Sequence, residues 1–140
     1  MTSSRWISNV PLDWSAEGVP WWDEAKDREM ARDWLVASAG KAFASTDVYN
    51  RVQELVQSDL DPGRGWRLVQ VLVEIADSDR QLRLIGSEAI SPLIANHSEL
   101  VDGELATLAR GDVKFRRAIQ DQMSVELFEF KKRHGLSTKV

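Results

Sequence analysis

One stretch, residues 66–76, constrains the fold more than any other part of this sequence. It is apolar except at Arg67, Gln70 and Glu74. Those three residues are spaced by three and four positions, so a helix gathers them into one narrow stripe, whereas a strand divides them between its two faces. A helix with so little polar surface needs cover on nearly every side. The pattern therefore predicts a central helix within an all-α fold.

Capping residues and helix breakers divide the rest of the chain. Thr46 or Asp47 caps one helix, and an Asp cap before Pro62 starts the central one. Ser78 followed by Gln81 has the form of a capping box. The signals predict about six helices: from residue 22, after residue 47, from 62 through 76, from 78 with a kink near 91, over 100–109, and over 112–133.

The last of these helices is predicted to be continuous. Phe115, Ile119, Met123 and Leu127 recur every four residues and form one apolar ladder. Gly135 is expected to end this helix.

The helices predict a compact bundle or a short stack of helical hairpins, without a repeat of fixed period. We divide the chain into an N-terminal arm at 1–21, a single helical domain at 22–134 and a C-terminal tail at 135–140. Five of the six Trp residues fall within the first 34 positions. The arm is too apolar to leave in water and is expected to pack on the helices. We expect Trp34 and Trp66 in the core.

The segment Gly63-Arg64-Gly65 precedes a helix and invites comparison with a phosphate-binding loop. It lacks the preceding strand and the Gly-x-x-x-x-Gly-Lys spacing of such a loop. We interpret it as a turn capped by Asp61.

The composition excludes most kinds of catalytic and metal-binding site. The chain has no Cys, which excludes disulfides, thiolate metal sites and thiol nucleophiles. Its only two imidazoles, His97 and His134, are 37 residues apart, and neither has a second His one turn away. We therefore predict no catalytic residue, no cofactor and no metal site.

The charge favours a protein partner over nucleic acid. The net charge is −4, and residues 1–62 carry 6 basic and 11 acidic side chains against 12 and 11 in residues 63–140. An acidic front half disfavours phosphate binding, which depends on clustered Lys and Arg. Trp is enriched at binding hot spots. The predicted partner-binding residues are Trp21, Trp22, Asp23, Glu24 and Asp27.

These observations favour a non-enzymatic, protein-binding domain. The size, acidity and absence of catalytic groups are typical of a bacterial immunity or antitoxin-type inhibitor that sequesters a partner, such as a basic toxin. One alternative is a structural or adaptor subunit that acts through homo-oligomerisation; a second is an enzyme of unrecognised type, with His97 in a polar cleft. Without an apolar run of membrane-spanning length or a secretory signal, we expect a cytoplasmic protein, monomeric or homodimeric, that binds neither membrane nor nucleic acid.

A pattern runs through the second half of the chain: a Trp-bearing apolar helix, an acid-rich turn, a further helical segment, a His and a terminal Phe-Arg. The residues that carry it are Trp66, Leu68, Val69, Leu72, Ile75, Asp77, Asp79, Ile85-Gly86-Ser87, Ile90, Leu93-Ile94, His97 and Phe115-Arg116. Over residues 66–116 the chain thereby resembles a family of small uncharacterised bacterial helical domains. The family has a Gly-Pro-Leu-Glu-type segment where this chain has Glu88-Ala89-Ile90-Ser91. The resemblance implies a helical fold and no established activity.

Overall fold

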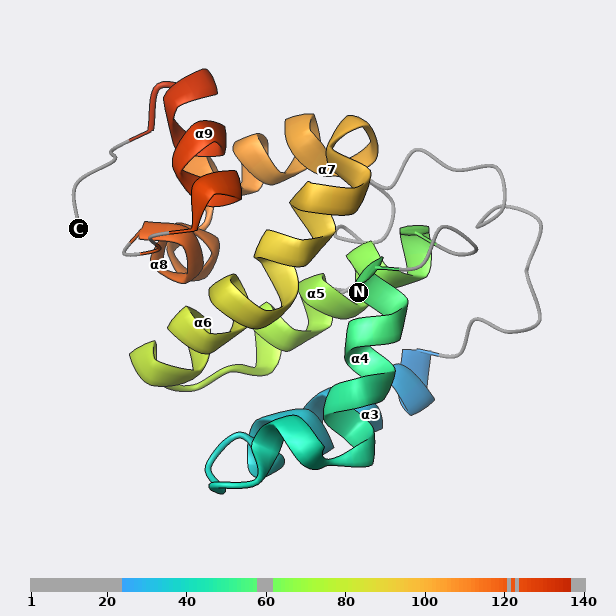
Figure 1. The fold of residues 1–140 in the computed structure, drawn as a ribbon. Helices are drawn as coiled ribbons and strands as arrows, with labels where there is room; N and C mark the ends of the chain where they lie inside the picture. Colours follow the sequence, from blue (N-terminus) through green and yellow to red (C-terminus); the bar gives the residue numbers. More distant parts are fainter. Residues whose placement is uncertain (1–23, 58–61, 121, 123, 137–140) are drawn as a thin grey trace.

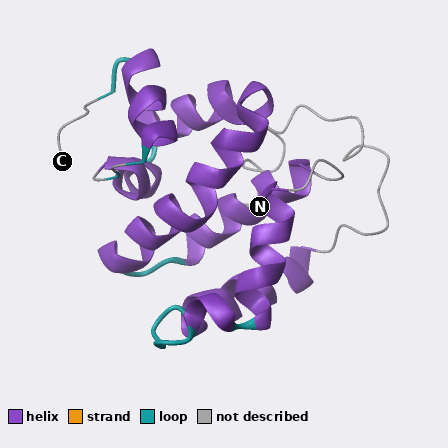
Figure 2. Ribbon diagram, viewed as in Figure 1, coloured by secondary structure: helices purple, strands orange, loops and turns teal. Residues whose placement is uncertain are grey.

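The computed structural model describes residues 24–57, 62–120, 122 and 124–136. This part of the chain consists of helices joined by short turns and loops and contains no strand (Figure 2), which confirms the all-α prediction. The elements are α3 (Glu24–Ala37), the 3-10 turn η1 (Phe43–Ser45), α4 (Asp47–Gln57), α5 (Pro62–Ile75), α6 (Asp79–Ile85), the π-helical turn η2 (Gly86–Ile90), α7 (Ser91–Gly111), α8 (Val113–Gln120) and α9 (Val125–Arg133). The arm predicted at 1–21 lies outside the described residues.

Helix α5 occupies the centre of the bundle (Figure 1) and contacts α3, α4, α6, α7 and α8. Trp66 on this helix is fully buried, as is Trp34 on α3, so both belong to the core as predicted. The polar stripe of α5 is less exposed than a surface stripe would be. Arg67 is 1% exposed and Gln70 is 2% exposed. The central position of α5 is therefore confirmed, and most of its stripe is also inside the fold.

Two of the predicted capping residues, Thr46 and Ser78, act as caps, whereas Asp61 lies outside the described residues. The Thr46 hydroxyl accepts a hydrogen bond from the Tyr49 backbone N–H at 3.2 Å. Ser78 accepts one from the Gln81 N–H, also at 3.2 Å. The Gln81 side chain reaches back to accept from the Asp77 N–H at 2.8 Å. These bonds satisfy N–H groups at helix starts that have no partner within the helix.

The prediction of one helix over 112–133 is wrong, because the chain forms α8 and α9 in its place. Ser124 caps α9 by accepting from the Leu127 N–H at 3.3 Å. The buried ammonium of Lys131 donates to the carbonyl oxygens of Gln120 at 2.9 Å and Gln122 at 3.4 Å. Lys131 thus supplies the hydrogen bonds that the end of α8 loses when the helix stops.

Two glycines allow helices to touch through their backbones. Gly65 lies within α5, which begins at Pro62 as predicted, so residues 63–65 belong to the first turn of this helix and do not form a separate turn before it. A Cβ at position 65 would lie 2.4 Å from the carbonyl oxygen of Leu55 on α4. A Cβ on Gly86 in η2 would lie 1.9 Å from the carbonyl oxygen of Ala118 on α8. Both helix crossings therefore require a residue without a side chain.

The end of α9 follows the prediction for Gly135. This glycine has φ +67°, a left-handed conformation that suits a residue without Cβ. Its N–H donates to the Lys132 carbonyl at 3.3 Å, and the Leu136 N–H donates to the Lys131 carbonyl at 2.8 Å, the hydrogen-bond pair of a Schellman motif. Leu136 also packs against the core. The chain therefore stays on the helical body beyond its glycine, and residues 137–140 of the predicted tail lie outside the described residues.

The helical segment that runs from α6 through α7 departs from α-helical geometry at two places. After α6 comes the π-turn η2, in which the Ser91 N–H donates to the Gly86 carbonyl, and Pro92 follows in the first turn of α7. This confirms the restart predicted near Ser91, where Pro cannot donate to the preceding turn. His97 has φ −140° and ψ 37°, so α7 is kinked at that residue.

Candidate partner-binding site

The structure describes the side chain of one of the five predicted partner-binding residues. Trp21, Trp22 and Asp23 lie outside the described residues, and Glu24 is the first residue of α3, with its side chain not described. Asp27 is 0% exposed. Its carboxylate accepts hydrogen bonds from Arg64 Nη2 at 2.8 Å and Nε at 3.4 Å. Asp27 therefore forms an internal ion pair between α3 and α5, and its assignment to a charged surface rim needs correction.

The helical register of α3 explains this burial. Ala31, Trp34 and Ser38 are buried on α3 and at its end. Asp27 precedes Ala31 by four positions and Trp34 by seven, so it shares their face. An acid on that face needs a cation from the neighbouring helix, and Arg64 supplies it.

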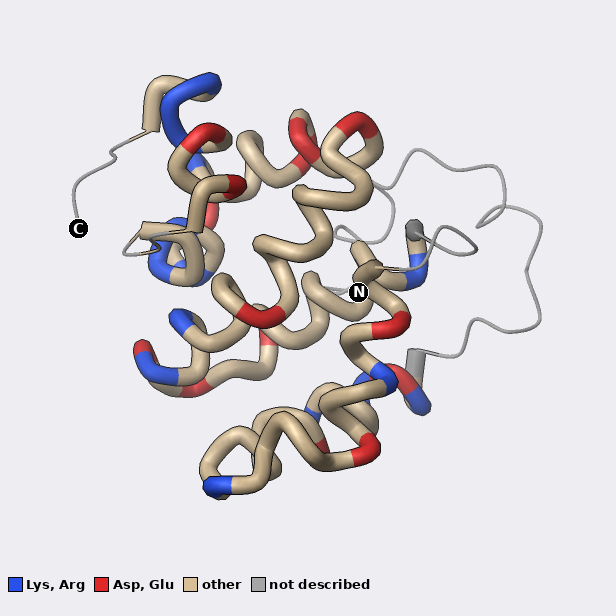
Figure 3. The backbone as a smooth tube through the Cα atoms, in the orientation of Figure 1, with Lys and Arg blue, Asp and Glu red and all other residues tan. Residues whose placement is uncertain are grey.

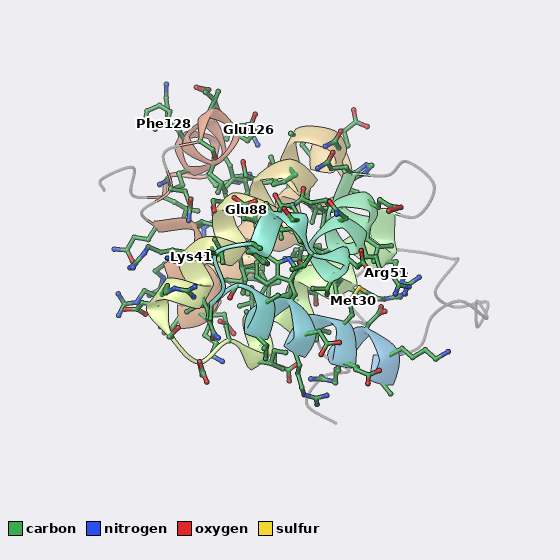
Figure 4. All side chains as sticks on the ribbon, turned by 60° about the horizontal axis from the view of Figure 1, so that its bottom comes forward. Met30, Lys41, Arg51, Glu88, Glu126 and Phe128 are labelled. Carbon is green, nitrogen blue, oxygen red and sulfur yellow. The ribbon has the colours of Figure 1, made fainter. Side chains whose placement is uncertain are left out.

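Other acidic residues of the same region are at the surface, around a groove between α3 and α4. The groove encloses about 390 Å³. We call it the α3–α4 groove; its lining residues are Lys26, Glu29, Met30 and Asp33 from α3, Asp47, Val48 and Arg51 from α4, and Arg64 from α5. Figure 4 shows Met30 and Arg51 next to one another at this junction.

The α3–α4 groove combines a half-buried apolar floor with a charged rim. Met30 and Val48 are partly buried and pack against the core. Glu29, Asp33 and Asp47 are exposed. Within the described part of the chain, no cation lies within ion-pairing distance of these three carboxylates. Their charges are consequently available to a ligand from outside.

Comparison with protein-family models, curated proteins and solved structures finds no match to this chain. Within the described ranges, no helix combines the length and the apolar run needed to cross a bilayer. The same residues include no cluster of three or more His, Asp or Glu side chains arranged to hold a metal ion.

The two histidines occupy different environments. His97 is half-buried at the kink of α7, beside a depression whose described lining comes from residues 96–100 alone. His134 Nε2 lies 2.5 Å from Asp102 Oδ2, and Arg133 donates to the other oxygen of Asp102 at 2.5 Å. Burial alone would raise the pKa of Asp102, but the hydrogen bonds from Arg133 and His134 outweigh it and hold that pKa below its usual value. This cluster joins α7 to the end of α9.

The π-turn η2 is held against α4 by two polar contacts. Tyr49 donates its hydroxyl to the Glu88 carboxylate at 2.6 Å. Gln53 Nε2 donates to the Glu88 carbonyl oxygen at 2.5 Å, which satisfies a backbone acceptor within the π-turn. The aromatic rings of Tyr49 and Phe43 meet edge to face at 4.8 Å between centroids, and Phe43 meets Trp34 in the same way at 4.9 Å.

We expect the titration of Tyr49 to report on this contact. The hydrogen bond to Glu88, followed by burial and the charge of that carboxylate, raises the pKa of Tyr49 from 10.0 to about 12. Because the folded state holds this proton more tightly than the unfolded chain, the stability from the contact is present below pH 10.0 and is lost as the pH rises toward about 12. Tyr49 is the only tyrosine, so near-ultraviolet tyrosinate absorbance measures it alone.

The unfolded chain in urea and the variant Glu88→Ala provide the controls for this titration. Both are expected to move the midpoint back toward 10.0, the value of a tyrosine without the contact. A folded wild-type protein that titrates near 10.0 would contradict the Tyr49–Glu88 bond.

Proposed function

We propose that the chain is a non-enzymatic protein-binding domain, and that its α3–α4 groove receives a basic segment of the partner. The observation that carries this proposal is the set of exposed carboxylates with no cation partner among the described residues, Glu29, Asp33 and Asp47, around the apolar floor of Met30 and Val48. Apolar anchors surrounded by a charged rim are the usual anatomy of a protein interface. Glu29, Asp33 and Asp47 differ from the acidic residues predicted from the sequence, which were Asp23, Glu24 and Asp27.

A lysine or arginine of the partner suits this groove. Its aliphatic stem would lie on Met30 and Val48 while its charged end reached the carboxylates at the rim. Lys26 and Arg51 on the same rim would repel a cation placed beside them. The alternation of signs would therefore fix the register of a bound segment, as complementary charges do at other interfaces.

The class of partner that we propose is a basic toxin, with this chain as its immunity or antitoxin-type inhibitor. The chain is small, carries a net charge of −4 and has an acidic front half. Opposite net charges accelerate encounter between an inhibitor and its target. Inhibition by such a domain needs only that it cover the partner's working surface, and it requires no catalytic group.

Reversing the three rim charges is expected to abolish protection and weaken binding about a hundredfold. In the variant Glu29→Lys, Asp33→Lys, Asp47→Lys, a basic partner segment would meet like charges, which cost several kcal/mol. The chain is co-expressed with the toxin candidate encoded beside its gene. Growth is scored, and the dissociation constant is measured on the purified pair.

The matched control reverses three exposed acids elsewhere, at Asp77, Glu99 and Glu129. It changes the net charge by the same amount and is expected to leave protection intact. Equal loss in both variants would assign the effect to net charge and overturn the role of the groove. A wild-type chain that remains alone in the co-purification would remove the support for this partner.

An exposed apolar pair supports a second candidate function, a homo-oligomeric adaptor. Val125 is 71% exposed and Phe128 is 42% exposed, three positions apart on one face of α9. A second copy of the chain could cover this face. Light scattering on the purified protein separates a dimer of this kind from a monomeric inhibitor.

A further inference from the structure

A second hollow, on the α6 side of the bundle, differs from the α3–α4 groove in charge and in the elements that form it. It encloses about 430 Å³. We call it the arginine pocket; the residues that matter for its chemistry are Ser38, Phe43, Arg80, Arg83, Leu84 and Ser87. They come from the end of α3, from η1, from α6 and from the π-turn η2. In Figure 3 the basic positions of α6 lie on the same side of the molecule as those of α8.

Two arginines on one face of α6, Arg80 and Arg83, line this pocket. Arg80, Arg83 and Ser87 are separated by three and four positions, so their side chains project from the same side. Arg80 Nη2 donates to the Ser38 carbonyl oxygen, which ties that side chain to the opposite wall. The backbone carbonyl of Arg83 accepts from Gln122 Nε2 at 2.6 Å. The frame of the pocket is thus held from α3 and from the segment after α8.

The positive charge of the pocket is not neutralised by the described residues. No described carboxylate lines it, and none within the described ranges lies within ion-pairing distance of Arg80 or Arg83. Two acids close in sequence have other partners: Asp79 pairs with Arg117 at 3.6 Å, and Glu88 accepts from Tyr49. Two like charges on successive turns repel each other, and an anion between them would relieve that repulsion.

We infer that the arginine pocket binds the phosphate group of a small phosphomonoester. Each guanidinium offers a planar fork of N–H donors. The Ser87 hydroxyl donates to the Leu84 carbonyl oxygen at 3.2 Å, so the two arginines supply the donors for a ligand. One guanidinium is enough to satisfy the two oxygens and single charge of a carboxylate. A phosphomonoester has three terminal oxygens and up to two negative charges, which match two guanidiniums.

The apolar wall of the pocket indicates that the ligand carries an organic group next to its phosphate. Phe43 and Leu84 line the same hollow and are partly buried against the core. The hollow is shallow and open to solvent, and its volume of about 430 Å³ leaves room for a small organic group beside the phosphate. A ligand whose phosphate meets Arg80 and Arg83 could place an apolar group against Phe43. This site is separate from the α3–α4 groove and does not depend on the proposed protein partner.

The test is calorimetric titration of the full chain, in low-salt buffer without phosphate, with phenyl phosphate, inorganic phosphate and benzoate. Phenyl phosphate is expected to bind most tightly, because it alone combines the phosphate with an apolar body. The variant Arg83→Ala should weaken its binding by about tenfold or more, since it removes charge-assisted hydrogen bonds. The matched control Arg32→Ala, which removes an exposed guanidinium from α3, should change it by less than about twofold.

Three results would overturn the inference. Equal weakening by Arg83→Ala and Arg32→Ala would show attraction by net charge alone. Benzoate binding as tightly as phenyl phosphate would show a carboxylate site. Failure of phenyl phosphate to bind the wild-type chain, whose fold is checked by circular dichroism, would show that the pocket does not take this ligand.

Vesicles distinguish a free ligand from a lipid headgroup that carries the same chemistry. Sedimentation with vesicles containing phosphatidic acid, compared with phosphatidylcholine alone, should leave the protein in the supernatant. Sedimentation that depends on Arg83 would assign the phosphate to a lipid and overturn the assignment to a small molecule.

Discussion

The variant Gly86→Ala is expected to lose about 2–4 kcal/mol of unfolding free energy, because the new methyl group has no room. Its Cβ would lie 1.9 Å from the Ala118 carbonyl oxygen and 3.0 Å from the Ala118 carbonyl carbon. Both are backbone atoms of α8, so no side-chain rotation relieves the clash. The helices must separate, and the contacts that α8 makes with α6 and η2 loosen along their length.

Urea unfolding followed by circular dichroism measures this loss, and Gly103→Ala is the matched control. Gly103 lies in the interior of α7, and a Cβ there would meet nothing within 4 Å. Alanine should be neutral or gain up to about 1 kcal/mol at that position, because it favours helix more than glycine does. If both variants shifted the midpoint equally and in the same direction, the close approach of η2 to α8 would be contradicted.

The second large effect is expected at Asp27, where alanine should cost about 3 kcal/mol of unfolding free energy. Removing one partner of a buried ion pair leaves the other charge without compensation. Asp27 is fully buried, whereas the Arg64 side chain keeps 21% of its surface exposed. Water can therefore reach part of the guanidinium, which places the expected cost toward the lower end for buried pairs.

Asp33→Ala is the matched control for this variant. It removes the same charge from the same helix, but Asp33 is exposed, so its effect should remain within about 0.5 kcal/mol. Asp27→Asn keeps the shape of the side chain and should fall between the two. Chemical denaturation of the three variants side by side gives the comparison, and equal stability of Asp27→Ala and Asp33→Ala would contradict the internal ion pair.

The position of Asp27 could have been read from the sequence. Its spacing of four from Ala31 and seven from Trp34 already placed it on the buried face of α3. The composition marks Asp27 only as one acid among several, whereas its helical register predicts that its side chain is buried. Glu29 and Asp33 share a different stripe of the same helix with Met30. The opposite wall of the α3–α4 groove belongs to α4, however, and the pairing of two helices is not visible in one sequence.

The all-α class and the starts of α4, α5 and α6 followed from local signals, because caps and apolar periods act over a few residues. The break between α8 and α9 did not, because neither Gly nor Pro interrupts the apolar ladder there. Ser124 offered a cap three residues before Leu127, but the stop also uses the Lys131 ammonium, which reaches back eleven positions to Gln120. Tertiary bonds of this kind override a regular period.

The arginine pocket was beyond prediction for a related reason. Arg80, Arg83 and Ser87 form a local stripe that the sequence displays, but Ser38 and Phe43 approach it from about forty residues away. A single chain gives the register of each helix and does not give the neighbour that faces it. Charged side chains on one helix face are usually exposed to solvent. Here Ser38 and Phe43 lie opposite Arg80 and Arg83, and this second wall completes the pocket.

Gly65 and Gly86, which lie at the two helix crossings, limit how far the sequence of this fold can diverge. Most surface positions of this bundle can accept substitution at little cost in stability, so relatives could differ from it widely in sequence. Positions 65 and 86 cannot drift in the same way, because each holds a helix against the backbone of another. A pair of helical glycines twenty-one residues apart, the first in the opening turn of an apolar helix, would therefore mark distant homologues after the surface between them had changed beyond recognition.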